Sequence, residues 1–164
     1  MLLSARTYYT IFILVFVGPI QASNNSGVAP DFILKNNYSE SIHLKDQIGD
    51  VVMLNFWASW CGPCRQEMPH LEKMYKEYSQ AGFTILAISV DEDTAEADRF
   101  MSELKVTFPY LYDNNNKVSE LFGVEAMPTT ILIDRLGRKR FMHKGYQPGF
   151  EQKYLREVKL LLRE

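Results

Sequence analysis

Two cysteines separated by two residues, Cys61 and Cys64, are the strongest chemical signal in this 164-residue sequence, and they are its only cysteines. A Cys-x-x-Cys pair can form a small, strained disulfide that opens and closes, or it can supply half of a zinc site. The other half is missing, because the three histidines, His43, His70 and His143, lie far apart in the sequence. The spacing therefore favours thiol-disulfide chemistry, for which neither a metal nor an organic cofactor is expected.

The segments on either side of the pair predict the elements that hold it. Residues 50–58 are nearly continuously apolar and rich in β-branched and aromatic side chains, which is typical of a strand buried on both faces. From Gly62 to about Ala81 apolar residues recur at helical spacing, and Gly82 is expected to end that helix. The cysteines are therefore expected where a buried strand turns into a helix.

This position predicts different roles for the two thiols. Cys61 is expected at the helix N-terminus, where unpaired backbone N–H groups and the helix dipole stabilise a thiolate and lower the pKa of the thiol. Pro63 fits the first turn, where the N–H that proline lacks would be unpaired in any case. Cys64 lies one turn further in, and we expect it to be shielded. Cys61 is the predicted nucleophile and Cys64 the predicted resolving thiol.

The rest of the chain alternates between strand and helix patterns. Turn residues 134–137 place the last two strands in a hairpin, with Gly137 at a position that needs positive φ. Alternating strands and helices followed by a hairpin and a helix predict one α/β domain over residues 29–164, with a mixed central sheet flanked by helices, after a flexible segment at 23–28. Besides the strand at 50–58 and the helix that follows it, the predicted strands are 83–90, 129–133 and 140–146. The other predicted helices are 94–105, a short one ending at 122, and 151–162.

Residues 1–22 have the order of a secretory signal peptide. One basic residue, Arg6, precedes an apolar run at 11–17, and Ala22 supplies a small residue before a polar stretch. The apolar run is about ten residues even when counted generously, whereas roughly twenty are needed to span a bilayer. A cleaved signal is therefore favoured over an N-terminal anchor. We expect an exported protein, periplasmic or on the outer face of the membrane, where disulfides persist.

Composition and charge exclude several classes of function. Hydrophobic residues make up 46% and charged residues 23%, which is typical of a globular domain and not of a disordered tail or a repeat array. Lysine and arginine number 18 against 20 acidic residues, so the net charge is −2. Without a basic field to gather phosphates, nucleic acid is not an expected partner. The chain is expected to be a monomer.

The sequence around the cysteines resembles the thioredoxin-fold proteins, and within them the exported TlpA/ResA-like thiol-disulfide oxidoreductases. Trp60-Cys61-Gly62-Pro63-Cys64 and the preceding residues 54–58 carry most of the resemblance, which extends from about residue 29 to 162. Residues 29–32 resemble the family's first segment, 89–91 a strand end, and 127–134 its cis-proline strand. Asn55 departs from the buried Asp that cytosolic thioredoxins have at this position and agrees with the exported group.

The resemblance gives further residues expected roles, each beside a simpler one. Glu67, one helical turn after Cys64, is either a solvated acid that complements the helix dipole or a carboxylate that exchanges a proton when the disulfide opens. The exported group tends to have an acid here, which favours the second role, with desolvation raising the pKa of Glu67 and of Cys64. Asn55 is either structural or part of this proton control.

Substrate contacts are expected beside the cysteines. The resemblance implies a cis bond between Met127 and Pro128, which would leave the Met127 backbone free to pair with an extended substrate segment. Trp60 is expected on the rim beside the sulfurs, whereas Trp57 is expected in the core.

The expected activity is reduction of disulfides in other exported proteins by dithiol exchange. The resemblance implies a membrane thiol reductant as electron donor and cytochrome c maturation as a pathway. One alternative is a disulfide oxidase or isomerase, although Gly-Pro between the cysteines favours the reducing side. Another is a thiol peroxidase of the peroxiredoxin type, which would use a lone cysteine preceded by threonine, whereas Trp60 precedes Cys61. A third is a copper- or haem-handling module using His70 or His143.

Overall fold

The structure, a computed structural model, describes residues 27–164. The predicted signal peptide at 1–22 and most of the predicted flexible segment lie outside the described residues. Between residues 27 and 164, no helix combines the length and the apolar character that crossing a bilayer requires.

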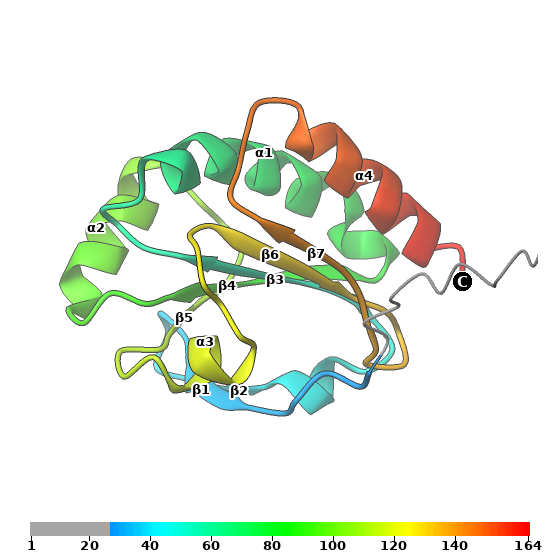
Figure 1. The fold of residues 1–164 in the computed structure, drawn as a ribbon, viewed down its shortest axis with the longest axis horizontal. Coiled ribbons are helices and arrows are strands. Elements are labelled where there is room, and N and C mark those ends of the chain that lie inside the picture. Colours follow the sequence, from blue (N-terminus) through cyan, green and yellow to red (C-terminus); the bar gives the residue numbers. More distant parts are fainter. Residues whose placement is uncertain (1–26) are drawn as a thin grey trace, which may run out of the picture.

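A five-stranded mixed sheet in the order β5-β4-β3-β6-β7 forms the centre of the molecule (Figure 1). β3, β4 and β5 are parallel, whereas β6 and β7 continue the sheet in antiparallel pairs. Every residue of the middle strand is buried, as its continuous apolar pattern predicts. The strands are β3 (Val51–Trp57), β4 (Phe83–Ser89), β5 (Tyr110–Tyr112), β6 (Thr129–Ile133) and β7 (Lys139–Lys144).

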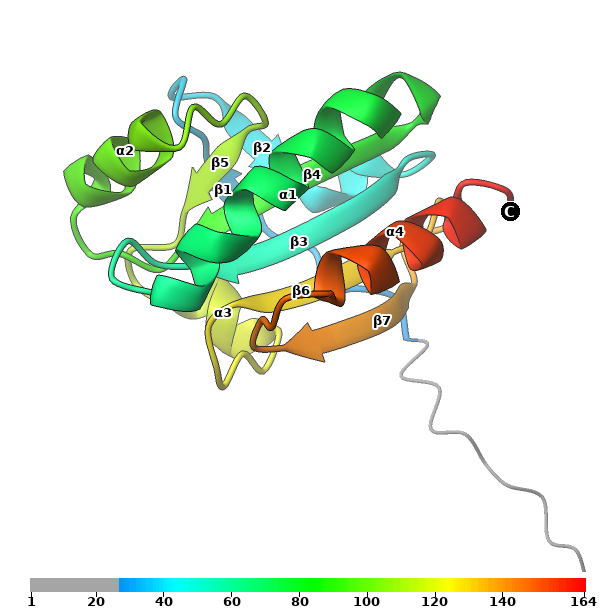
Figure 2. The same cartoon turned by 90° about the horizontal axis from the view of Figure 1, so that it is seen from above.

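Helices cover both faces of the sheet, which confirms the predicted architecture (Figures 1 and 2). One face carries α1 and α4 side by side, with α2 nearer to β5, and the other carries α3 and the small hairpin β1–β2. A separate cluster of buried apolar side chains lies between the sheet and each of these two layers. The elements are α1 (Gly62–Tyr78), α2 (Thr94–Glu103), α3 (Lys117–Leu121), α4 (Phe150–Leu161), β1 (Ile33–Lys35), β2 (Ser41–His43) and two 3-10 turns, η1 (Leu44–Gln47) and η2 (Ser79–Ala81).

The structure adds three short strands, β1, β2 and β5, that the sequence did not predict. Each has three residues, which is too few for an alternating pattern to stand out. β5 pairs with β4 and, at Leu111, with Asn36 just after β1, whereas β1 and β2 pair with each other. These strands are recognised by their pairing and not by a sequence pattern.

The helix that carries the cysteines ends as predicted. After α1 and the turn η2, Gly82 has φ 84°, a left-handed conformation that side chains other than that of glycine rarely adopt. A Cβ atom at Gly82 would come within 2.8 Å of the Arg135 guanidinium. That group donates hydrogen bonds to the carbonyls of Gly49 (2.6 Å) and Ala81 (3.3 Å). The conformation therefore favours glycine at position 82, and a larger residue would also have to displace the Arg135 guanidinium.

Candidate active site

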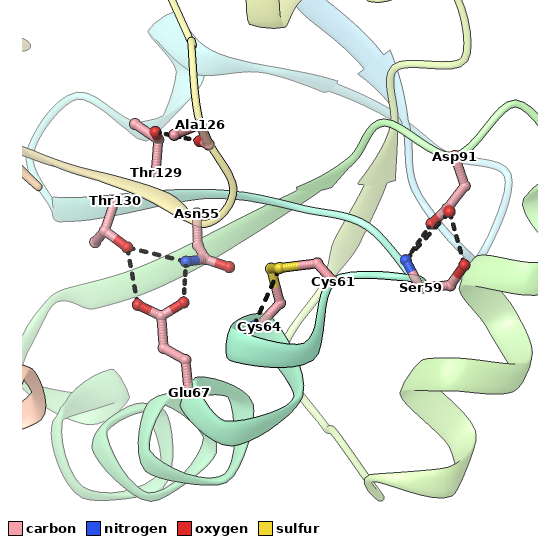
Figure 3. Close-up of a disulfide and its surroundings, with 9 residues drawn as sticks. All are labelled: Asn55, Ser59, Cys61, Cys64, Glu67, Asp91, Ala126, Thr129 and Thr130. Atoms are coloured by element: carbon pink, nitrogen blue, oxygen red, sulfur yellow. Dashed lines mark hydrogen bonds between the residues drawn. A yellow bond between two sulfur atoms is a disulfide. The ribbon is translucent and has the colours of Figure 1, made fainter. Parts of the chain in front are cut away.

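Cys61 and Cys64 form a disulfide where β3 turns into α1 (Figure 3). Cys61 is the N-cap residue of α1, and its Sγ accepts a hydrogen bond from the backbone N–H of Cys64 at 3.2 Å. The two residues differ in access, because Cys61 is 5% exposed whereas Cys64 is completely buried. Substrate can therefore approach Cys61 more easily than Cys64.

An open cleft lies beside Cys61 and has the expected residues on its walls. Trp60, Gly62 and Pro63 form one wall with Cys61, and residues 124–127 form the other. Trp60 is 72% exposed, so it is the rim residue that the sequence predicts. The Met127–Pro128 peptide bond is cis. Because β6 begins only at Thr129, the Met127 backbone lies outside the central sheet. The cleft thus brings together the accessible cysteine and an unpaired stretch of backbone.

Glu67 lies on the buried side of the disulfide, one turn along α1 from Cys64 (Figure 3). Its side chain is completely buried. Asn55 Nδ2 donates hydrogen bonds to Glu67 Oε2 and to Thr130 Oγ1, each at 2.9 Å, and Thr130 Oγ1 donates to Glu67 Oε1 at 3.2 Å. Burial raises the pKa of Glu67 to about 7, although these hydrogen bonds oppose the shift.

The structure brings Asn55 and Glu67 into direct contact, which the sequence did not specify. The strand–helix packing does this, because Asn55 on β3 faces the first turns of α1. Thr130 is the member of the cluster that sequence reasoning missed. It joins because β6 pairs with β3 in a register that sets Thr130 opposite Asn55.

A second missed residue, Asp91, supports the loop that precedes the cysteines. Its carboxylate is buried and accepts hydrogen bonds from the backbone N–H (2.9 Å) and the hydroxyl (2.8 Å) of Ser59 (Figure 3). It also accepts one from the Ser89 hydroxyl at 2.8 Å. The end of β4 is thereby tied to the segment between β3 and α1. The sequence marked residues 89–91 only as a strand end.

Trp57 is the core residue that the sequence predicts. It is completely buried, and its ring stacks on Phe100 of α2 at a centroid distance of 4.9 Å. The Arg65 guanidinium covers the same Phe100 ring at 4.5 Å. These contacts fix the first turn of α1 against α2.

Within residues 27–164, acidic, histidine and cysteine side chains do not gather into a group of three or more that could hold a metal ion.

Comparisons with known proteins agree with this geometry. A sequence model of the AhpC/TSA family matches residues 26–141. The thiol-disulfide oxidoreductase ResA of Geobacillus thermodenitrificans is 37% identical over 145 residues, which cover 88% of this chain and 83% of the relative. ResA of Bacillus subtilis is 37% identical over 130 residues, covering 79% of this chain and 72% of the relative.

Solved structures give the same answer. A crystal structure from Chlorobium tepidum, named as a thiol:disulfide interchange protein DsbE, has a TM-score of 0.81 and 36% sequence identity. The match covers 84% of this chain and 96% of that one. Together with the disulfide at the N-terminus of α1, these matches show that the chain belongs to the AhpC/TSA family of thioredoxin-fold proteins and is a ResA-like thiol-disulfide oxidoreductase.

Proposed function

We propose that this protein reduces disulfides in other exported proteins, with Cys61 as the nucleophile and Cys64 as the resolving thiol. The observation that carries the assignment of roles is the unequal access of the two residues. Cys61 borders the open cleft, whereas Cys64 is closed off from solvent beneath it. A substrate sulfur can reach the first and not the second.

The proposed reaction is a two-step exchange. In the reduced protein, the Cys61 thiolate attacks one sulfur of the substrate disulfide, and the electron pair of the broken bond leaves on the other substrate sulfur. The Cys64 thiolate then attacks Cys61 Sγ and releases the remaining substrate sulfur as a thiolate. The two substrate thiolates take protons from water. The substrate gains two electrons, and the protein ends with the disulfide that the structure contains.

Glu67 is the proposed acceptor of the Cys64 proton. A carboxyl group with a pKa near neutrality changes protonation at the pH where a thiol must lose its proton. Successive helical turns place Cys64 and Glu67 as neighbours on α1, with their Cβ atoms roughly 5–6 Å apart. The two groups are expected to titrate as a coupled pair in the reduced protein.

The cleft beside Cys61 is the proposed substrate site. An extended substrate segment is expected to pair with the backbone at Met127, while Trp60 and Pro63 contact its side chains. Backbone pairing suits a protein that must accept different substrate sequences, because its hydrogen bonds are made to main-chain groups, which every sequence has.

The proposed location is outside the cytoplasm. The signal-like residues 1–22 support export, and a membrane thiol reductant would return Cys61 and Cys64 to the dithiol form. Cytochrome c maturation, which needs reduced haem-binding cysteines, is the pathway that the sequence resemblance favours. N-terminal sequencing of the protein recovered from a native host tests the export step, since retention of residues 1–22 on a cytoplasmic protein contradicts it.

The variant that tests the assignment of roles is Cys64→Ser. It should accumulate mixed disulfides between Cys61 and substrate proteins, because the resolving attack is lost. Mass spectrometry of the trapped partners would identify the substrate class. Cys61→Ser is the matched control and should trap no partner. Trapping by Cys61→Ser and not by Cys64→Ser would contradict the assignment of the nucleophile, and trapping by neither would contradict dithiol exchange with proteins.

A further inference from the structure

A row of polar residues crosses three adjacent strands beneath α1 and α4. Asn55 on β3 pairs in register with Thr130 on β6, which pairs with His143 on β7. Side chains in such register lie on the same face of a sheet. All three are buried. Glu67 from α1 contacts the first two residues of the row, and Glu157 from α4 contacts the third.

At the outer end of the row, His143 and Glu157 form a buried pair that has no role in the proposed reaction. His143 Nε2 lies 2.7 Å from Glu157 Oε2, and only 7% of the His143 side chain and 11% of the Glu157 side chain are exposed. A contact of this length is typical of a charge-assisted hydrogen bond, which a ring N–H can donate to a carboxylate and which fixes the position of the imidazole.

Tyr154 links this pair to Glu67. It lies on α4 one turn before Glu157, is completely buried, and places its ring 5.0 Å from the His143 ring. Its hydroxyl has no hydrogen-bond partner among the described residues. Desolvation and the nearby charge of Glu67 raise the pKa of Tyr154, so the hydroxyl keeps its proton. It can therefore turn toward Glu67 as a donor or as an acceptor.

Among the described residues, the groups that bear on Glu67 from the surrounding elements are mostly neutral. β3 and β6 present Asn55 and Thr130, and Tyr154 comes from α4. Tyr146, after β7, is also neutral: its hydroxyl donates to Glu151 at 2.9 Å, and burial, Glu151 and the charge of Glu67 raise its pKa. His143 is the member of this set that can supply a positive charge, and that charge favours the ionised form of Glu67.

We propose that His143 is a positioning residue for the redox reaction: protonated and held by Glu157, it keeps Glu67 as the carboxylate that accepts the proton of Cys64. The inference rests on the proposed function and extends it across the sheet. In the step concerned, the Cys64 S–H bond breaks, a Glu67 O–H bond forms, and the Cys64 thiolate keeps the electron pair with which it attacks Cys61 Sγ. His143 touches none of the reacting atoms.

The test is the pH dependence of disulfide reduction by the reduced full-length protein, with and without His143→Gln. In the parent, the rate should rise with pH as Glu67 ionises. Without the imidazolium charge, Glu67 should ionise at higher pH, so the rising limb should move up by about one pH unit. At a pH well below the rising limb, His143→Gln should reduce the substrate about tenfold more slowly than the parent does. Near pH 9 the rates of the variant and the parent should converge.

Two control variants separate this effect from loss of packing. His70→Gln removes an exposed histidine from the same helix as Glu67, and it should leave the limb in place because water and salt screen its charge. Glu67→Gln should remove the limb. If Glu67→Gln removes the limb but His143→Gln only lowers the rate equally at every pH, the inference fails and the proposed function stands. If the parent reduces no disulfide at any pH, the proposed function itself fails.

A measurement on the parent protein keeps the inference testable if His143→Gln does not fold. NMR titration of the oxidised protein follows the Glu67 carboxyl carbon and the His143 ring directly. The inference requires a charged His143 ring at a pH where Glu67 is ionised. A His143 ring that is neutral at every such pH would overturn the inference, whatever the variants show.

Discussion

Glu67 is a carboxyl group enclosed by protein and held by two neutral donors, Asn55 and Thr130. Hydrogen bonds from neutral groups replace only part of the hydration that a carboxylate loses on burial. The proton is therefore held more tightly in the folded protein than in the unfolded chain. Glu72, only five residues later, has the opposite balance, since Lys76 and Thr107 contact its carboxylate and lower its pKa.

This contrast predicts opposite effects on stability for two glutamine substitutions. The pKa of Glu67 is raised from 4.5 to about 7, so the parent loses stability as pH rises through that window. Glu67→Gln removes the loss, and above pH 7 the oxidised variant should be more stable than the parent by on the order of 3 kcal/mol at most. Urea unfolding at several pH values measures the difference. Glu72→Gln should instead be less stable than the parent at neutral pH.

The same Glu67→Gln variant should reduce disulfides more slowly. Glutamine keeps the size of Glu67 but cannot take a proton, so the rate should fall within the roughly 100-fold to 10,000-fold contribution of general acid-base catalysis. Stopped-flow reduction of a disulfide substrate between about pH 5 and 9 measures it, with Glu72→Gln as the control of unchanged rate. A variant that matches the parent across this range would leave Glu67 with a structural role only.

At the scale of elements, Gly82 sets where the helix that carries the cysteines ends. Alanine at position 82 must adopt positive φ and must also displace the Arg135 guanidinium. Gly123 is a matched control, because it also has positive φ (65°) but has open space where a Cβ atom would lie. Gly123→Ala should lose roughly 1–2 kcal/mol, the cost of the left-handed conformation alone. Gly82→Ala should lose about 1 kcal/mol more, because hydrogen bonds of Arg135 are also broken.

Denaturant unfolding of both glycine variants in the oxidised state measures these losses. Equal losses would show that Arg135 moves aside without cost and that its contacts with Gly49 and Ala81 add nothing to stability.

The sequence predicted elements that carry a strong local pattern and missed those that depend on distant partners. β3 and α1 have long runs of one periodicity, so the Cys61–Cys64 position and the place of Glu67 followed from spacing. Thr130 and Asp91 reach the site only through strand register and loop packing. His143 and Glu157 come from different elements and meet only when α4 packs on the sheet. No local pattern marks such contacts.

At the scale of the whole molecule, the reduction potential compares the folded dithiol form with the folded disulfide form. A protein that donates electrons must favour its disulfide form, so we expect a reduction potential below about −200 mV. For comparison, the reduction potential of protein disulfide isomerase is about −180 mV. A difference of about 30 mV corresponds to about 1.4 kcal/mol for two electrons. Equilibration with a glutathione or dithiothreitol series, followed by alkylation, measures the potential. A value above about −180 mV would favour the oxidase or isomerase alternative.

The two tryptophans give the molecule a built-in optical signal. They are the only two in the chain, and both precede Cys61 within four residues, but their environments are opposite. Trp60 is 72% exposed beside Cys61, whereas Trp57 is sealed against Phe100. A disulfide quenches the emission of an adjacent indole, and opening it relieves the quenching. Fluorescence of the unlabelled protein should therefore brighten on reduction, with the solvent-facing indole emitting at longer wavelength than its buried neighbour, so turnover can be followed without a dye.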